Sequence, residues 1–434
     1  MKKAATLITA SVILILLAGG LFATETARKS LTRTLYPVIA TGDQTDLCSA
    51  PISNYRLYAI KDGRMQPIPF QIDERHQNGE FVLTGGENPT TDEDEGIFDK
   101  NDELVFMARD TGDKLAAQDM LPDNIEAVAE LEISDPVTGD TAWAYLISFN
   151  FPQEPLETDY VSYKPTHQTI STPYYAAGFN PDHPAAPSDY SFMKALNGSG
   201  EDFLDRAKIR VAMRSMGITL HRNEEDIKVK EIGYIDGPVR VVVYNQTTTP
   251  LFLGIPASST KQYTYYYPMN ADFGFAVSFP LKPGMFRVEI IDDFKDAIGW
   301  TFYNSNNPEG LMIDGETGPA DKNLDRSPWD WSVLSDGTHS FWSRWKTPED
   351  CTVAAAQYFN DDMTAEDELE DTPGESPGIG FDFKDGWKEL EEDRVEFRLI
   401  HFFTRGYTPA MVQEITQVHD APLEVSENDV DMDG

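Results

Sequence analysis

A run of carboxylates between residues 92 and 103 is the part of this sequence that comes nearest to a metal-binding motif. Asp92, Asp94 and Glu103 stand at positions 1, 3 and 12 of a twelve-residue loop, where calcium loops of the helix–loop–helix type carry ligands. The turn glycine, Gly96, falls at position 5 instead of 6, and Lys100 occupies position 9. An irregular Ca²⁺ site is one prediction, and an acidic loop that caps a hairpin is the alternative. The ligands of the predicted Ca²⁺ site are Asp92, Asp94, Asp99 and Asp102.

Four tryptophans stand within seventeen residues, together with a histidine and an arginine. Trp342 and Trp345 are three residues apart, so in a regular strand they point to opposite faces of the sheet. We expect one in the core and one exposed, where a sugar ring can stack on the indole, and Tyr263, Tyr265 and Tyr267 share a strand face that could extend this platform. The alternative is that these aromatic residues fill a large core. The candidate ligand-binding residues are Trp329, Trp331, His339, Trp342, Arg344 and Trp345.

No spacing in the sequence predicts a catalytic centre. The seven histidines include no pair at i,i+2 or i,i+4, which a local zinc site would need. The sequence contains neither a Gly-x-Ser-x-Gly elbow nor a phosphate-binding loop. We therefore assign no catalytic residue, and the sequence favours a protein that binds over one that catalyses.

The two cysteines, Cys48 and Cys351, bear on the redox environment of the protein. Outside the cytoplasm two thiols are normally oxidised, so a disulfide between them is predicted, and two separate buried thiols are the alternative. A bond between them would close a loop of about 300 residues, for which chain entropy gives a stabilisation of about 5 kcal/mol. The sequence has no Cys-x-x-Cys-His motif, which excludes covalently attached haem.

The N-terminus has the pattern of an export signal. Lys2 and Lys3 precede an uncharged run from Ala4 to Ala23, which is typical of a secretory segment. Leu21 stands where a cleavage site favours a small residue, and the run is about long enough to span a bilayer. Residues 1–23 are thus predicted to be a signal peptide or a membrane anchor. The remainder is predicted to work outside the cytoplasm, in the periplasm, on the cell surface or as a secreted protein.

The chain is strongly acidic, with 73 Asp and Glu against 35 Lys and Arg and a formal charge of −38. Such a surface repels nucleic acid and anionic lipid and attracts cations, basic proteins or neutral ligands. We expect no nucleic-acid partner and no membrane contact beyond the N-terminal segment. The expected partners are a carbohydrate ligand or a basic protein, although the charge could serve solubility alone.

Alternating apolar residues and Gly or Pro turns predict strands along most of the chain. The predicted fold class is all-β, with an N-terminal β-sandwich followed by a larger antiparallel β-supersandwich. The later candidate strands include 394–403 and 410–417. The predicted organisation is a sandwich domain over 31–155, an extended linker over 156–219, a large sandwich over 220–420 and an acidic disordered tail over 421–434.

The segment from Asp236 to Val243, which reads Asp-Gly-Pro-Val-Arg-Val-Val-Val, precedes a tyrosine-rich strand at 262–267. This arrangement resembles the opening of the β-supersandwich domains of mutarotase-like and polysaccharide-lyase proteins. The resemblance covers about 220–420 and implies a supersandwich fold and a link to carbohydrate. Those enzymes use His, Tyr, Arg or carboxylate side chains on a sheet face, and His339 and Arg344 are the nearest counterparts here. By general character the whole chain resembles exported proteins of Gram-negative bacteria.

Three functions follow from these observations. The first is a non-enzymatic extracytoplasmic binding protein, with carbohydrate as its ligand. The second is a structural or assembly subunit of a cell-surface or respiratory complex that docks a basic partner through its acidic surface. The third is a carbohydrate-active lyase or epimerase with a general base on a sheet face. An exposed tryptophan in a groove beside His339 would favour the two carbohydrate functions, whereas burial of all four tryptophans would remove the carbohydrate hypothesis and favour docking to a partner.

Overall fold

The computed structural model of the protein describes residues 27–116, 120–215, 217–250, 258–278, 285–366, 374–390, 394–428 and 430. The predicted signal peptide or anchor over residues 1–23 lies outside these ranges. Within them, no helix has both the length and the apolar character needed to cross a membrane.

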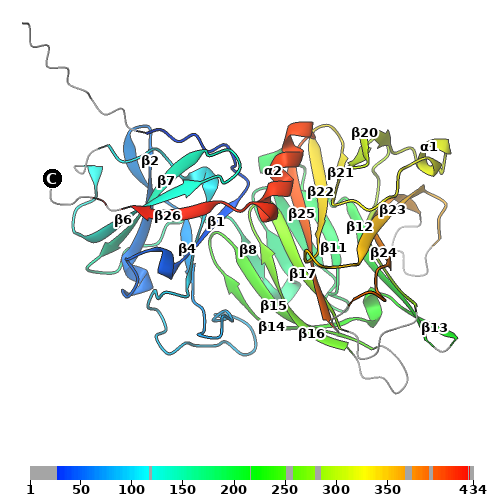
Figure 1. The fold of residues 1–434 in the computed structure, drawn as a ribbon, viewed down its shortest axis with the longest axis horizontal. Coiled ribbons are helices and arrows are strands. Elements are labelled where there is room, and N and C mark those ends of the chain that lie inside the picture. The colour runs from blue at the N-terminus through cyan, green and yellow to red at the C-terminus, as the bar shows by residue number, and fades with distance from the viewer. Residues whose placement is uncertain are drawn as a thin grey trace, which may run out of the picture.

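The protein is all-β, which confirms the predicted fold class, and its strands form two parts that lie side by side (Figure 1). The smaller part has two antiparallel sheets around one apolar core, and we call it the N-terminal sandwich. Its three-stranded sheet has the order β1 (Pro37–Thr41), β5 (Glu103–Met107), β4 (Phe70–Asp73). Its five-stranded sheet has the order β26 (Glu424–Asn428), β6 (Ile125–Ser134), β7 (Thr141–Phe149), β2 (Tyr55–Lys61), β3 (Arg64–Ile68).

The larger part contains three antiparallel sheets, and its core lies between the two largest. The nine-stranded sheet has the order β14 (Lys228–Asp236), β15 (Val241–Thr249), β16 (Ser258–Tyr266), β17 (Asn270–Ser278), β25 (Arg394–Arg405), β22 (His339–Lys346), β21 (Trp331–Ser335), β19 (Thr301–Asn304), β20 (Asn307–Met312). A five-stranded sheet faces it, in the order β13 (Ile218–Arg222), β12 (Leu204–Ser215), β18 (Met285–Phe294), β24 (Glu375–Asp385), β23 (Ala354–Asp362). The third sheet has the order β11 (Pro187–Phe192), β10 (Tyr175–Phe179), β9 (Thr169–Ser171), β8 (Ser162–Lys164). A single helical turn, α1 (Pro319–Lys322), and the longer helix α2 (Pro409–Asp420) complete the fold.

The segment 156–219, predicted as an extended linker, belongs to the larger part. It supplies the four-stranded sheet and also β12, which lies between β13 and β18 in the five-stranded sheet. The charges of β12 hid this role, because a strand in a core is expected to be apolar. Lys208, only 1% exposed, is compensated by Asp293 at 2.8 Å and Glu375 at 3.2 Å, so the strand can be buried.

Two predictions near the C-terminus are also wrong. Residues 410–417, predicted as a strand, form helix α2, which begins at Pro409 and buries Ile415 and Val418, three residues apart, on one face. The tail, predicted as disordered over 421–434, contains β26, which pairs with 130–134 of β6. That pairing gives the edge of β6 a partner and carries the chain from α2 back to the N-terminal sandwich (Figure 1).

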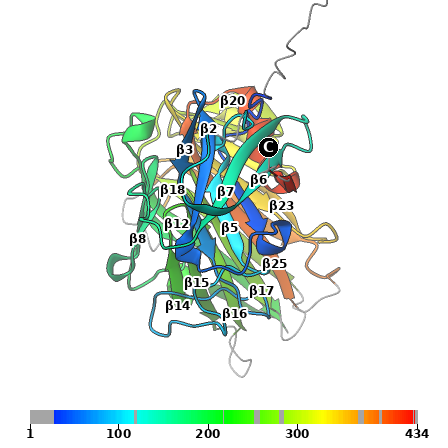
Figure 2. The ribbon, with the colours of Figure 1, turned by 90° about the vertical axis from the view of Figure 1, so that its left-hand side faces the viewer.

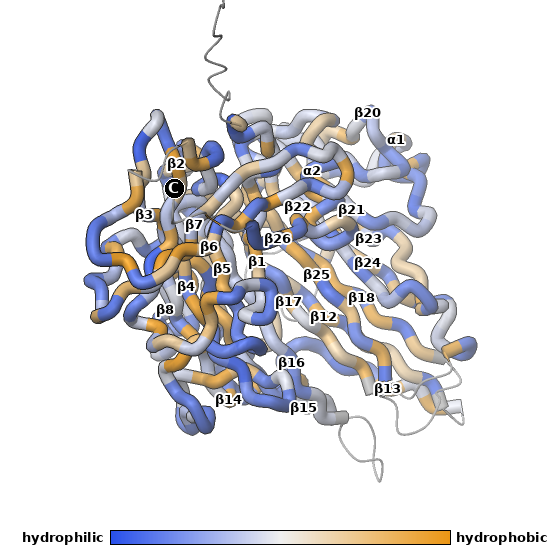
Figure 3. The backbone as a smooth tube through the Cα atoms, turned by 60° about the vertical axis from the view of Figure 1, so that its left-hand side comes forward, coloured by the Kyte–Doolittle hydropathy of each residue, from blue (hydrophilic) through white to orange (hydrophobic). Residues whose placement is uncertain are grey.

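The nine-stranded sheet is buried on both faces over part of its area, and β25 shows where. Along β25, Val395, Phe397 and Leu399 belong to the core between the two large sheets. On the opposite face, Ile400 and Phe402 join the core of the N-terminal sandwich and α2. Figure 3 shows hydrophobic and hydrophilic residues alternating along the large sheets. In Figure 2, where the N-terminal sandwich faces the viewer, β14, β15 and β16 extend beyond it.

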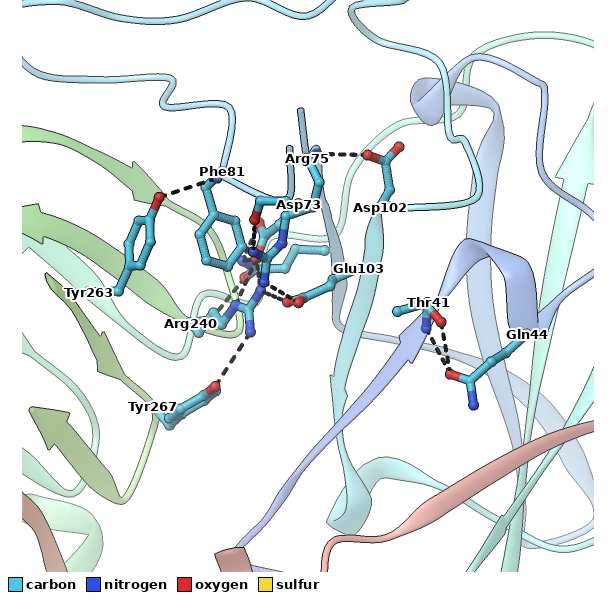
Figure 4. Close-up of polar contacts among 12 residues, drawn as sticks. Thr41, Gln44, Asp73, Arg75, Phe81, Asp102, Glu103, Arg240, Tyr263 and Tyr267 are labelled. Carbon is cyan, nitrogen blue, oxygen red and sulfur yellow. Dashed lines mark hydrogen bonds and ion pairs between the residues drawn. The ribbon is translucent and has the colours of Figure 1, made fainter. Parts of the chain in front are cut away.

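A buried arginine joins the N-terminal sandwich to the nine-stranded sheet (Figure 4). Arg240, at the start of β15, is 1% exposed. Its guanidinium pairs with Asp73 of β4 at 2.7 Å and with Glu103 of β5. The side-chain oxygen of Gln71 accepts hydrogen bonds from the backbone N–H groups of Val239 and Arg240, at 2.9 and 2.8 Å. Polar contacts thus fix how the two parts meet.

We expect Arg240→Met to lower the free energy of unfolding by about 3 kcal/mol or more, because it leaves the buried Asp73 carboxylate without its cation and removes one of the two cations of Glu103. Chemical denaturation measures this loss. Lys230→Met is the matched control, since the Lys230–Glu87 pair has side chains 64% and 72% exposed and contributes little. Equal stability of both variants would contradict the role of Arg240.

Candidate functional site

All four clustered tryptophans are buried, so the predicted exposed indole is wrong. Trp342 is fully buried and Trp331 is 7% exposed, both in the core under the N-terminal sandwich, and their rings lie 5.9 Å apart. Trp329 and Trp345 lie on the other side, in the core between the large sheets. The opposite orientation of Trp342 and Trp345 is as predicted. Neither is exposed, because the sheet is covered on both faces here.

His339 and Arg344 do not form a site with these tryptophans. The His339 ring stacks on Phe192 at 4.9 Å and its Nδ1 lies 2.8 Å from Asp336. The Arg344 guanidinium donates to the carbonyl of Thr416 and pairs with Asp420, so it anchors helix α2 to the sheet. Both side chains therefore have structural contacts in place of ligand contacts.

The predicted Ca²⁺ site does not assemble. In the described ranges, no three His, Cys, Asp or Glu side chains gather in a way that could hold a metal ion. The Asp102 carboxylate is buried and accepts hydrogen bonds from the backbone N–H groups of Arg75 and Asp99, both at 2.8 Å. Asp92 instead lies 3.9 Å from the His76 ring. The Asp102 carboxylate thus holds the backbone of the loop in place through hydrogen bonds.

The predicted disulfide is also wrong, because Cys48 and Cys351 are both free thiols. Cys48 packs against the core under the N-terminal sandwich, and Cys351 packs against the core between the two large sheets. The two residues belong to separate cores, which is why the alternative of two unrelated thiols holds.

Two adjoining cavities lie on the outer face of the nine-stranded sheet. The first, of about 450 Å³, is enclosed by this sheet, the N-terminal sandwich and the end of α2. The second, of about 500 Å³, continues along the same sheet. The cavities share Tyr265, Lys346 and Arg398, so we treat them as one site and call it the tyrosine groove. Both volumes lie in the range of small-molecule sites.

The strand register places the floor of the tyrosine groove. Tyr265 of β16 pairs with Asp272 of β17, which pairs with Ile400 of β25. Two residues along the same face, Gly274 pairs with Arg398. Paired residues share a face, so these side chains lie in rows across the sheet. Along this face of β25 the side chain changes from the apolar Ile400, buried under the N-terminal sandwich, to the charged Arg398, which lines the groove.

Tyrosine rings line one side of the groove, as the shared face of 263, 265 and 267 predicts. Tyr244 stacks on Tyr263 with ring centroids 4.2 Å apart, and the Tyr263–Tyr265 and Tyr265–Tyr267 distances are 6.3 and 6.5 Å. Arg398 lies over the Tyr265 ring at 5.2 Å. Burial raises the pKa of Tyr263 and Tyr265 to about 12, so both hydroxyl groups stay protonated at neutral pH.

Asn270 lies in the wall of the groove and has a buried, unsatisfied side-chain amide. This residue opens β17, is 1% exposed and lines the first cavity. Within the described residues, neither its side-chain nitrogen nor its side-chain oxygen has a hydrogen-bond partner. Leaving a buried amide unpaired costs free energy, so such a group calls for an explanation. A ligand that both donates and accepts hydrogen bonds would satisfy it.

A polar chain of three residues lies beside Asn270. Arg398 holds the Asp272 carboxylate through Nε at 2.8 Å and Nη2 at 2.6 Å, and His419 Nε2 lies 3.0 Å from the same carboxylate. Burial lowers the pKa of His419 to about 3, helped by the charges of Arg398 and Lys346, so the imidazole is neutral. A neutral His419 then donates from Nε2 to Asp272, which fixes both side chains in the groove wall.

A second group of chemically active residues lies in the core and is closed to ligands. Ser343 Oγ donates to Asp292 at 3.1 Å, Asp292 lies 3.5 Å from His401 Nε2, and Tyr190 is 2.8 Å from His401 Nδ1. All four side chains are almost fully buried. The set contains a serine, a histidine and an aspartate, yet no substrate can reach it, so its role is structural.

Sequence reasoning missed the polar residues of the groove. Their signal was present on alternate positions of two strands: Asn270 and Asp272 on β17, and Arg398 on β25 just before the apolar Ile400. A change from polar to apolar along one face marks the edge of a covered surface. His419 and Glu103 carried no such signal, because they reach the groove through long-range packing.

Comparisons with known proteins assign no family. No family model matches the chain, and no curated protein is similar to it in sequence. Among solved structures, an alpha-mannosidase from Enterococcus faecalis V583 matches with 9% identity and a TM-score of 0.48, over 94% of this chain and 47% of that chain. The alpha-N-acetylgalactosaminidase NagBb from Bifidobacterium bifidum, in complex with GalNAc, matches with 12% identity and a TM-score of 0.36, over 58% and 38%. The chain thus spans about half of the mannosidase chain, and likenesses this weak carry no argument about its function.

We expect Asn270→Leu to raise the free energy of unfolding by about 1 kcal/mol, because it removes an unpaired buried amide and keeps the side chain's volume. Asn304→Leu is the matched control. Asn304 is also fully buried, but it donates to Gln357 at 2.8 Å and accepts from the backbone of Asn306 and Asn307. Its substitution should lower stability by about 1–3 kcal/mol. A large loss of stability in both variants, measured by denaturation, would show that Asn270 is already satisfied.

The pH dependence of stability tests the buried Asp292. Burial raises its pKa to about 7 in the folded chain, whereas an unfolded aspartate titrates near 4. The folded chain holds this proton more tightly, so the stabilisation is full below about pH 4 and is lost as pH rises through 7. His401 acts in the opposite sense, because burial lowers its pKa to about 3. Because His401 is present in both proteins, we expect the melting temperature of Asp292→Asn, measured relative to the wild type, to increase between pH 4 and 7, and parallel curves would contradict this assignment.

Proposed function

We propose that this chain is an extracytoplasmic, non-enzymatic protein that binds a saccharide in the tyrosine groove. The observation that carries this proposal is the unpaired Asn270 amide at the floor of a cavity of about 450 Å³. A sugar hydroxyl donates and accepts at one atom, so vicinal hydroxyls can satisfy both ends of an amide. This groove replaces the tryptophan cluster as the candidate site.

The other residues of the groove suit the same ligand. Tyr263 and Tyr265 are half-buried, so each presents part of its ring, and the C–H face of a sugar packs on such surfaces. The ion pair between Arg398 and Asp272 supplies planar donors and acceptors that are held in place before a ligand arrives. Aromatic faces beside a few fixed polar groups are typical of sites for small polar molecules.

The protonation states of the groove favour binding over catalysis. A general acid or base works best with a pKa near the operating pH. The pKa of His419 is lowered to about 3, and that of Tyr265 is raised to about 12. The pKa of Glu103 is lowered by Arg240 and Arg75, against the effect of burial, so it stays an anion. Burial raises the pKa of Asp272, but Arg398 opposes this shift and holds the carboxylate as an ion pair. A lyase or epimerase would need one of these groups to exchange a proton near neutrality.

The purified chain should bind saccharides on a glycan array, and calorimetry should then give the affinity for the best ligand. Tyr265→Ala should weaken that affinity about tenfold, through loss of the ring surface, while Tyr265→Phe should retain it. Tyr303→Ala is the control, because Tyr303 stacks on Tyr407 at 4.3 Å outside both cavities. Absence of any saccharide binding would contradict the proposal, and turnover of a bound saccharide would favour the enzymatic alternative.

A further inference from the structure

The tyrosine groove differs in charge from the rest of the chain. Over the whole sequence, acidic residues outnumber basic ones by 73 to 35. In the groove the balance is reversed, with five cationic side chains against three carboxylates. The cations are Arg75, Arg240, Lys261, Lys346 and Arg398, and the carboxylates are Glu103, Asp272 and Glu396.

Arg398 reaches the open space of the groove better than the carboxylate that it contacts. The Arg398 side chain is 38% exposed, while that of its partner Asp272 is 4% exposed. Arg75 and Arg240 both pair with the single carboxylate of Glu103, although Arg240 also contacts the buried Asp73. A ligand beside Arg398 therefore meets its guanidinium group before it meets the Asp272 carboxylate.

Two lysines extend this surface along the second cavity. Lys346 is 33% exposed and lies 3.0 Å from Asp420, which does not line either cavity. Lys261 is exposed and lies 5.8 Å from the centre of the Tyr244 ring. The cations thus follow the tyrosine rings from one cavity to the other. A guanidinium carries five N–H donors in a planar fork, more than one carboxylate accepts, and the same fork matches an oxyanion of a ligand.

We propose that the saccharide bound in the tyrosine groove carries an anionic group, a carboxylate or a sulfate, which Arg398, Lys346 and Lys261 of the second cavity receive. This inference rests on the proposed function and specifies its ligand class. A chain with a charge of −38 repels anions at long range, so a local reversal of charge selects an anionic ligand at the site itself. Asn270 and the tyrosines contact the neutral part of the sugar, and the cations contact its charge.

Calorimetry with three galactose-based tetrasaccharides of equal length tests this inference: neutral galactotetraose, tetragalacturonate and a sulfated carrageenan tetrasaccharide. We expect at least one acidic ligand to bind about tenfold more tightly than the neutral one, with a difference that shrinks at high salt. The two acidic ligands distinguish carboxylate from sulfate. Equal or tighter binding of galactotetraose would overturn the inference and leave the proposed function standing. Binding of none of these ligands, together with an empty glycan array, would overturn the proposed function.

Variants place the anionic group. Arg398→Gln should remove the preference for the acidic ligand, whereas Arg398→Lys should keep part of it. Because Arg398 also holds the buried Asp272, Lys261→Gln is a second variant that leaves the core untouched, and it should weaken acidic binding about threefold without changing neutral binding. Lys230→Gln, outside the groove, is the control. An unchanged preference in both Arg398→Gln and Lys261→Gln would contradict the assigned location.

Discussion

The N-terminal sandwich and α2 cover only part of the outer face of the nine-stranded sheet, and the position of the groove depends on where this cover ends. The inner face of the nine-stranded sheet packs on the five-stranded sheet, and part of its outer face packs on the N-terminal sandwich and α2. Ile400 and Phe402 lie under this cover, while Arg398, on the same face of β25, lies at its edge. The tyrosine groove lies where the N-terminal sandwich no longer covers the sheet. The ion pairs of Arg240 with Asp73 and Glu103 hold the edge of the sandwich at this place.

The edge of this junction, beside the groove, is polar. Its ion pairs stabilise the fold and also line the site. The ion pairs of Arg240 and Arg398 hold carboxylates that burial alone would destabilise. Among these satisfied groups, the side-chain amide of Asn270 has no hydrogen-bond partner in the described part of the chain. A packed apolar residue would cost less at that position, and a ligand with hydrogen-bonding groups would offset the cost of the unpaired amide. The same residues thus join the two parts and form the wall of the site.

Local periodicity predicted what lies within a strand, and it failed where distant segments meet. The all-β class, the opposite orientation of Trp342 and Trp345 and the shared face of the groove tyrosines all follow from a period of two residues. Whether an indole is exposed depends on a second layer, and no local signal announced that the N-terminal sandwich covers Trp342. The buried Lys208 concealed the interior strand β12 for a related reason, because its partners Asp293 and Glu375 are far away in the sequence.

A ligand in the tyrosine groove should complete the hydrogen bonding of the Asn270 side-chain amide. Nuclear magnetic resonance of the ¹⁵N-labelled chain tests it through the side-chain amide of this residue, assigned by its absence in Asn270→Leu. Titration with the best-binding saccharide should shift this resonance and slow its exchange with solvent, and the effect should saturate at the calorimetric stoichiometry. A bound saccharide that leaves the Asn270 amide unchanged would contradict the account.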